Sequence, residues 1–174
     1  MKSIAILSGV ALAALAGCAT PPTPRPMAHA QLEAKSGSAI QGRVTFAPHG
    51  EVTVVEAHIG GLTPGEHGFH VHEGGDCSAP DATSAKGHFN PAGKMHGHHH
   101  HHPMERHAGD LPNLVANAQG QAHYRAEVKG LVLKAGPEGI LERSVVIHAD
   151  PDDYKSQPAG NSGKRVACGV IKPI

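Results

Sequence analysis

The chain has no tryptophan, and aromatic residues make up only 3% of its 174 residues, whereas glycine (22) and proline (14) are abundant. This composition argues against packed helices and favours many short strands joined by turns. The chain also lacks an excess of either charge, because Lys+Arg and Asp+Glu both number 15, so nothing favours a nucleic-acid partner. Its length suits one domain. The outlier is histidine, with 16 residues, which points to metal binding.

The N-terminal segment predicts export. Lys2 provides a positive charge, an apolar run follows from Ile4 to Leu15, and small residues precede Cys18. The run is shorter than the ~20 residues of a membrane-spanning helix, so a transmembrane anchor is disfavoured. The four residues that end at Cys18 resemble a bacterial lipobox. We therefore expect residues 1–17 to be a lipoprotein-type signal peptide and Cys18 to be lipidated; an ordinary cleaved signal with an incidental cysteine is the alternative.

A proline-rich stretch, Thr20–Pro26, follows and can hold neither a helix nor a central strand. We interpret residues 18–38 as an extended tether between the lipid on Cys18 and a single domain at residues 39–174. The expected location is the periplasm or cell envelope. The lipid would attach the domain to a membrane, the outer one if the cell is Gram-negative.

Two further cysteines, Cys77 and Cys168, remain for the domain. In an exported domain, two cysteines most simply form one disulfide. Such a disulfide would close a loop of roughly ninety residues and contribute about 4 kcal/mol to stability on the chain-entropy model. The alternative, a cysteine metal site, lacks the paired Cys-x-x-Cys spacing.

Beyond the tether, apolar residues recur mostly at every second position, as in half-buried strands. Strands are expected over the segments 40–46, 52–59, 68–72, 122–128, 131–134, 145–148 and 165–171. Between His72 and Leu114 this alternation disappears. A loop of that length in a compact domain is usually functional or disordered, and bound metal would supply the order here.

Candidate metal ligands begin in one of these strands. His70 and His72 lie two residues apart, so both project from the same face and can converge on one ion. Further candidates follow at His88, His96, His107, Asp110 and His148. Imidazole-rich sites suit copper and zinc.

In order and spacing, these motifs resemble the copper–zinc superoxide dismutases, most closely the exported bacterial ones, from about Gly42 to Ile171. The resemblance implies an all-β fold, an eight-stranded antiparallel Greek-key β-barrel or sandwich with long metal-binding loops. It also implies an enzyme that converts superoxide to oxygen and hydrogen peroxide, with one copper and one zinc per subunit, and that protects the envelope against extracytoplasmic superoxide. A homodimer is left open.

The resemblance assigns roles to individual residues. The copper ligands would be His70, His72, His88 and His148, and the zinc ligands would be His88, His96, His107 and Asp110. His88 would bridge the two metals as an imidazolate, since only imidazole offers two opposed nitrogen donors, and would also carry a proton during catalysis. Asp152 would hydrogen-bond one copper and one zinc histidine. Arg165 would attract and orient the superoxide anion.

One segment departs from the family pattern. Five consecutive histidines, His98–His102, stand inside the region expected to bind zinc. His98 is therefore an alternative to His96 as a zinc ligand. The run itself fits either a solvated low-complexity insertion or a metal-collecting arm.

Two other classes of protein compete with the enzyme. A non-enzymatic copper- or zinc-binding protein on the same fold would use the same histidines. The other class is a purely structural β-sandwich adhesion module, which would not explain why the histidines stand in the order of the family.

Overall fold

Nine β-strands and one 3₁₀ turn, η1 (Thr83–Ala85), make up the regular structure of the part of the chain that the computed structural model describes, residues 24–100 and 105–174. The strands are β1 (Ala28–Ala34), β2 (Gln41–His49), β3 (Val52–Gly60), β4 (Gly65–His67), β5 (Phe69–His72), β6 (Leu114–Ala116), β7 (Ala122–Lys129), β8 (Ser144–His148) and β9 (Arg165–Pro173). Within those ranges no helix is long and apolar enough to cross a membrane. The predicted signal peptide and Cys18 lie outside the described residues.

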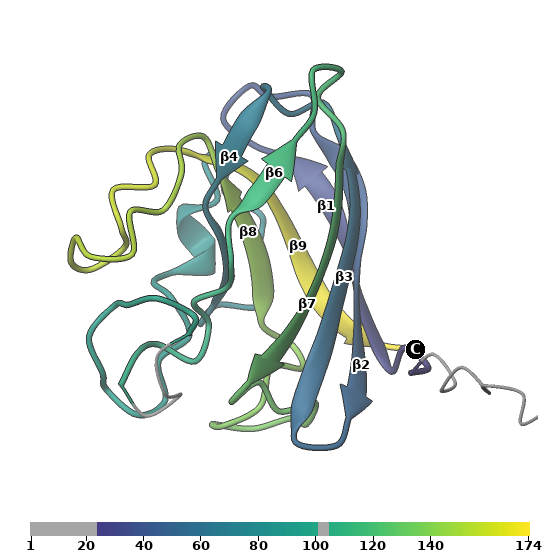
Figure 1. The fold of residues 1–174 in the computed structure, drawn as a ribbon, viewed down its shortest axis with the longest axis vertical. Coiled ribbons are helices and arrows are strands. Elements are labelled where there is room, and N and C mark those ends of the chain that lie inside the picture. Colours follow the sequence, from purple (N-terminus) through teal and green to yellow (C-terminus); the bar gives the residue numbers. More distant parts are fainter. Residues whose placement is uncertain (1–23, 101–104) are drawn as a thin grey trace, which may run out of the picture.

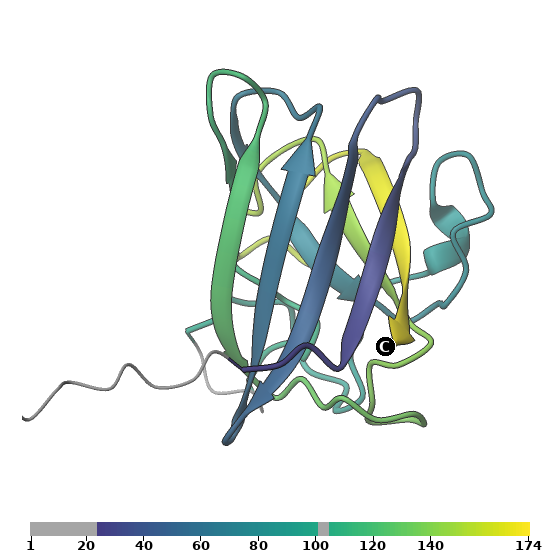
Figure 2. The ribbon, with the colours of Figure 1, turned by 90° about the vertical axis from the view of Figure 1, so that its right-hand side faces the viewer.

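Seven strands form one antiparallel sheet in the order β5-β8-β9-β1-β2-β3-β7, and β4 pairs with β6 in a separate ladder. The sheet curls, so that β1, β2, β3 and β7 form one layer and β9, β8 and β5 lie behind it (Figure 2). The largest apolar side chains buried in the described residues are Phe46, Phe69, Phe89, Leu111, Leu114, Ile140, Ile147 and Ile171. The all-β antiparallel Greek-key prediction is confirmed; in place of the expected eight strands, the described residues contain nine, seven of them in the curled sheet.

The domain begins earlier than expected. Strand β1 falls inside the segment interpreted as a tether, and it pairs with β2 on one side and β9 on the other. Ala28, Ala30 and Leu32 alternate into the core. Two of these three residues are alanines, whose hydrophobic signal is weak, so the local pattern hardly indicates a strand next to the prolines. The expected boundary at residue 39 is therefore too late.

Two differences concern short segments. Residues 131–134 do not form a strand; Leu131 is buried, but Val132 and Lys134 hydrogen-bond to residues 140 and 141 in a compact loop. Strands β4 and β6 were not expected, because three residues each are too few to show a period.

Two long loops border the candidate metal centre: one carries His88, His96, His107 and Asp110, and the other carries Asp152. One connects β5 to β6 and the other connects β8 to β9, and both project from the same side of the sheet (Figure 1). The predicted disulfide is confirmed: Cys77 in the first loop is bonded to Cys168 in β9, with Cα atoms 5.7 Å apart.

Candidate metal centre

Strand β5 carries His70 and His72, and all four of its residues are buried. One edge pairs with β8, and the other edge receives the backbones of two loop segments. The Val71 N–H donates to the Gly109 carbonyl (2.9 Å), the Phe89 N–H donates to the Val71 carbonyl (2.8 Å), and the Gly109 N–H donates to the Phe89 carbonyl (2.9 Å). This closed ring of three hydrogen bonds ties both segments to the strand and to each other.

The residues beside this ring are candidate ligands. His88 stands across from His72, and Asp110 stands across from His70. The close approach requires glycine at position 109, because a Cβ atom on Gly109 would lie 2.2 Å from a carbonyl oxygen of β5. Residues remote in the sequence are thereby fixed next to the two strand histidines.

Four buried imidazoles form a first set, called here the imidazole group: His70, His72, His88 and His148. Each offers a nitrogen that lies within 4.8 Å of the other three. Four ring nitrogens are buried without a hydrogen-bond partner: His70 Nδ1, His72 Nε2, His88 Nε2 and His148 Nε2. Buried polar atoms normally have partners, so this set fits a d-block ion that takes nitrogen ligands, such as copper.

The second nitrogen of each ring is held by an acceptor. His72 Nδ1 donates to the Lys86 carbonyl at 2.9 Å, and His148 Nδ1 donates to a backbone carbonyl at 3.3 Å. His70 Nε2 and His88 Nδ1 lie 2.8 and 2.9 Å from carboxylate oxygens. These contacts determine which nitrogen of each ring is left for a metal.

A second set, called here the carboxylate group, consists of His88, His96, His107 and Asp110. The Oδ1 atom of Asp110 lies 2.9, 3.0 and 3.3 Å from the Nδ1 atoms of His88, His96 and His107. Its Oδ2 atom accepts hydrogen bonds from the backbone N–H groups of Gly97 (3.1 Å) and His107 (3.2 Å). Three imidazole nitrogens and one carboxylate oxygen are a common tetrahedral zinc set. His88 belongs to both groups, one ring nitrogen in each.

Asp152 connects the two groups, as the resemblance implies. Its Oδ2 atom lies 2.8 Å from His70 Nε2, and its Oδ1 atom lies 2.9 Å from His96 Nε2. The Asn113 side chain makes two hydrogen bonds to the backbone of Asp152. Its Oδ1 atom accepts from the Asp152 N–H (3.0 Å), and its Nδ2 atom donates to the Asp152 carbonyl (3.1 Å). Glycine is needed at position 160, because a Cβ atom on Gly160 would lie 1.8 Å from Asp152 Oδ1.

Two more side chains that the sequence did not single out support the carboxylate group. The Gln157 amide accepts from the His96 N–H (2.8 Å) and donates to the His96 carbonyl (2.9 Å). The buried guanidinium of Arg106 donates to the carbonyls of His107 (2.7 Å) and Asp110 (3.2 Å). Gln157 lies in an irregular loop, where no residue spacing indicates a supporting role. For Arg106, the only signal in the sequence is its position next to His107.

Arg165 lies at a cleft of about 300 Å³ that reaches the imidazole group. The cleft is also lined by His88, His148, Pro158 and Ala159. The predicted anion-orienting residue and two of the four candidate copper ligands therefore face the same space. An anion that enters the cleft meets a guanidinium beside the imidazoles.

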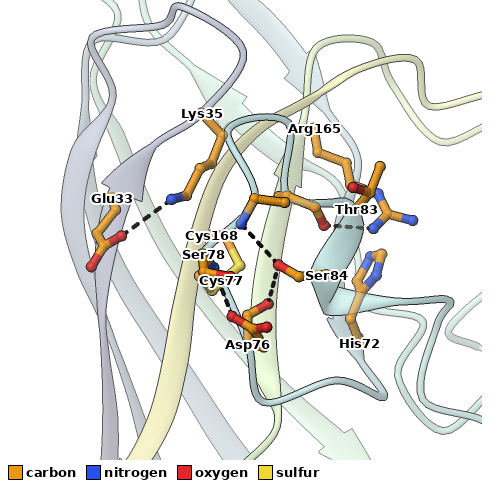
Figure 3. The surroundings of a disulfide bond; sticks show 12 residues. Glu33, Lys35, His72, Asp76, Cys77, Ser78, Thr83, Ser84, Arg165 and Cys168 are labelled. Atoms are coloured by element: carbon orange, nitrogen blue, oxygen red, sulfur yellow. Dashed lines mark hydrogen bonds and ion pairs between the residues drawn. A yellow bond between two sulfur atoms is a disulfide. The ribbon is translucent and has the colours of Figure 1, made fainter.

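Arg165 is held in place by the loop that contains the disulfide. Its Nη1 atom donates to the Ala82 carbonyl at 2.8 Å. Ala82 and Cys77 belong to the same loop, and Cys168 follows Arg165 by three residues in β9. Figure 3 shows this loop with the disulfide and with Arg165, which approaches the loop from β9; His72 lies nearby. The disulfide and the hydrogen bond together hold Arg165 where it lines the cleft.

Protonation differs between the two groups. Burial lowers the pKa of His70 and His72 well below the ordinary value, and the neighbouring His88 lowers both further. Burial and His88 likewise lower the pKa of His148 to about 4. These rings are therefore neutral at neutral pH, the form in which an imidazole binds a metal.

The carboxylate group is charged instead. Burial opposes protonation of His96, but its hydrogen bonds to Asp110 and Asp152 outweigh burial and raise its pKa to about 9. Burial opposes ionisation of Asp110, yet hydrogen bonds from His107, His88 and His96 hold the pKa of that carboxyl well below its usual range. Without metal, the second group therefore contains an ion pair between the Asp110 carboxylate and protonated His96, whereas the first group consists of neutral rings.

The two histidines considered for the carboxylate group lie in different places. His96 lies in the group, whereas His98 gathers with His99 and His100 in a separate cluster. The last two histidines of the run, His101 and His102, lie outside the described residues.

Comparison with known proteins gives a consistent result. The sequence profile of the family "Copper/zinc superoxide dismutase (SODC)" matches residues 40–171. A relative from Aquifex aeolicus, "Superoxide dismutase [Cu-Zn] 2", is 42% identical over 150 residues, which cover 83% of this chain and 86% of the relative. The "Superoxide dismutase [Cu-Zn]" of Deinococcus radiodurans is 39% identical over 160 residues, 86% of each chain.

A solved structure is also similar. The crystal structure of the clock protein EA4 superimposes with a TM-score of 0.76 at 39% sequence identity, covering 90% of this chain and 99% of that one.

Proposed function

Because the chain belongs to the copper/zinc superoxide dismutase family, it is an enzyme that converts superoxide to oxygen and hydrogen peroxide, and we propose how its residues divide this work. The imidazole group, His70, His72, His88 and His148, holds copper. The carboxylate group, His88, His96, His107 and Asp110, holds zinc. The observation that carries the assignment is the four buried ring nitrogens without partners in the imidazole group.

When bound, copper would supply the one-electron chemistry that oxidises one superoxide to oxygen and, with two protons, reduces a second to hydrogen peroxide, while zinc would supply a fixed positive charge. Arg165 draws the substrate anion into the cleft and orients it by charge and hydrogen bonding. His88 Nε2 is the atom suited to hold a proton for the product, because its Nδ1 atom is held on the carboxylate side by Asp110. Asp152 orients His70 and His96 by binding the Nε2 atom of each ring.

A His148→Ala variant tests this assignment. We expect copper content to fall below one per chain and chelator-resistant dismutation to drop by ~100-fold or more, because a ligand of the reacting metal is gone. His49→Ala, which removes an exposed histidine at the end of β2, should leave both unchanged. Full copper occupancy without activity in the unaltered protein would favour the non-enzymatic metal-binding protein instead.

Export and membrane attachment are the second part of the proposal. The disulfide between Cys77 and Cys168 supports it, because structural disulfides persist mainly in oxidising compartments. We propose that the chain protects the cell envelope against extracytoplasmic superoxide while anchored by lipid on Cys18. Mass spectrometry of the membrane fraction from cells that make the full chain should detect the acylated cysteine. A Cys18→Ser variant that stays membrane-bound would contradict lipid attachment.

A further inference from the structure

Three imidazoles gather at a point outside the two buried groups. His98, His99 and His100 each offer a ligand atom within 4.8 Å of the other two. Their ring centroids lie 4.3 Å (98–99), 4.7 Å (98–100) and 4.0 Å (99–100) apart. Consecutive side chains of an extended strand point to opposite faces; here a turn at residues 99–100 and a hydrogen bond from the His100 N–H to His98 Nδ1 (3.1 Å) bring them together.

This cluster packs against a fixed surface. The Tyr154 ring lies 4.4 Å from His98 and 5.8 Å from His99. Tyr154 is itself held, because its hydroxyl accepts from the Asn113 N–H (2.8 Å) and its own N–H donates to Asp152 (2.7 Å). The cluster therefore rests on the residues that orient Asp152, so it is positioned by the same loops as the buried centre.

The cluster also contains an unsatisfied nitrogen. His99 is partly buried, and its Nδ1 atom is buried without a hydrogen-bond partner. His98 is partly buried as well, whereas His100 is exposed. Three imidazoles whose ligand atoms lie close together, one of them on an exposed residue, are a donor set that d-block ions accept, with solvent completing the coordination.

We propose that His98, His99 and His100 form a third metal site that binds a divalent d-block cation such as Zn²⁺ and is separate from the two buried groups. It gives the metal-collecting alternative for the histidine run a defined set of ligands. The site binds more weakly than the carboxylate group, because no carboxylate belongs to the cluster as described. Because His100 is exposed, the ion is exchangeable.

Zinc titration of the holoenzyme tests the site. Protein with both buried sites filled, verified by metal analysis, is washed with a weak chelator and titrated with Zn²⁺ by calorimetry. We expect one additional Zn²⁺ per chain. The variant His98→Asn/His99→Asn/His100→Asn should bind it at least tenfold more weakly while it retains the two buried ions. Retention of those ions shows that the variant is folded and that the proposed function stands independently.

Two outcomes would overturn the proposal. Unchanged binding in the triple variant would assign the ion elsewhere, including to His101 and His102, which that variant keeps. A matched control, His58→Asn/His123→Asn, removes a histidine pair whose Nδ1 atoms lie 2.8 Å apart across β3 and β7. Loss of the additional ion in this control would place the site on the sheet instead of the loop.

Discussion

The two halves of the metal centre are built by different means. In the imidazole group, His70 and His72 lie on β5 and His148 ends β8, so neighbouring antiparallel strands position three of the four rings. In the carboxylate group, His96, His107 and Asp110 lie in a loop. Their positions depend on individual side chains, the Gln157 amide and the Arg106 guanidinium, and on the Asp110 carboxylate itself.

This difference has an electrostatic counterpart. The strand-borne half is composed of neutral rings, whereas the loop-borne half is organised around a carboxylate that accepts from three imidazoles and two backbone N–H groups. Strand pairing between β5 and β8 positions the first half. The second half needs its own charges to hold a loop together, so substitutions there should disturb structure as well as metal binding.

The largest effect is expected from Asp110→Asn. The change removes a zinc ligand and the acceptor that joins the three imidazoles. Zinc content should fall close to zero, and the stabilisation of ~4 kcal/mol that a ligand gives at a thousandfold excess over its Kd should be lost. Chemical denaturation with and without zinc measures this loss. Glu105→Gln removes an exposed carboxylate nearby and serves as control; an equal loss there would contradict the role of Asp110.

A smaller but still large effect should follow Gly160→Ala. At φ +66°, a Cβ atom on Gly160 would lie 1.8 Å from Asp152 Oδ1 and 2.7 Å from His96 Nε2. The hydrogen bond between Asp152 and His96 must open to make room for this atom. We expect a loss of ~1–3 kcal/mol in the free energy of unfolding and weaker zinc binding. Gly93→Ala is a matched control, since φ is +61° with no atom within 4 Å of the added Cβ. Equal losses in the two variants would show that backbone strain alone is responsible.

Gln157→Leu should separate the halves with a moderate effect. It removes both hydrogen bonds to the His96 backbone, so the zinc Kd should rise by ~10-fold while copper affinity stays the same. Competition with chelators of known affinity measures both constants. A parallel loss of copper affinity would mean that the two halves are not supported independently.

The smallest effect concerns the metal-free protein and pH. The folded-state pKa of His148 is lowered to about 4, so its contribution to stability is present above its unfolded pKa near 6.5 and is lost as pH falls toward 4. The pKa of His96 is raised to about 9, so its contribution is present below pH 6.5 and is lost as pH rises through 9. Thermal unfolding of His148→Asn should flatten the acid side of the profile, and His96→Asn the alkaline side. The reverse pattern would contradict the assigned charges.

The strand-borne half was accessible from the sequence, and the supports of the loop-borne half were not. The period-two spacing of His70 and His72 inside an apolar run is a local pattern with one geometric meaning. Gln157 lies 61 residues from the His96 backbone that it holds, and nothing local to either residue encodes that contact. β1 was missed for a related reason, since its alanines are buried by partners from both ends of the chain.

The anchored ends of the segment from His96 to His107 have a consequence for how the chain can change in evolution. His96 is held through its backbone by Gln157, and His107 is held by Arg106 and Asp110. When both ends of a segment are fixed, doubling its length costs only ~0.6 kcal/mol of closure entropy. Insertions between these two histidines are therefore nearly neutral for the buried centre. A run such as His98–His102 can be acquired there without disturbing the catalytic geometry, which makes this segment a place where the family can add new chemistry.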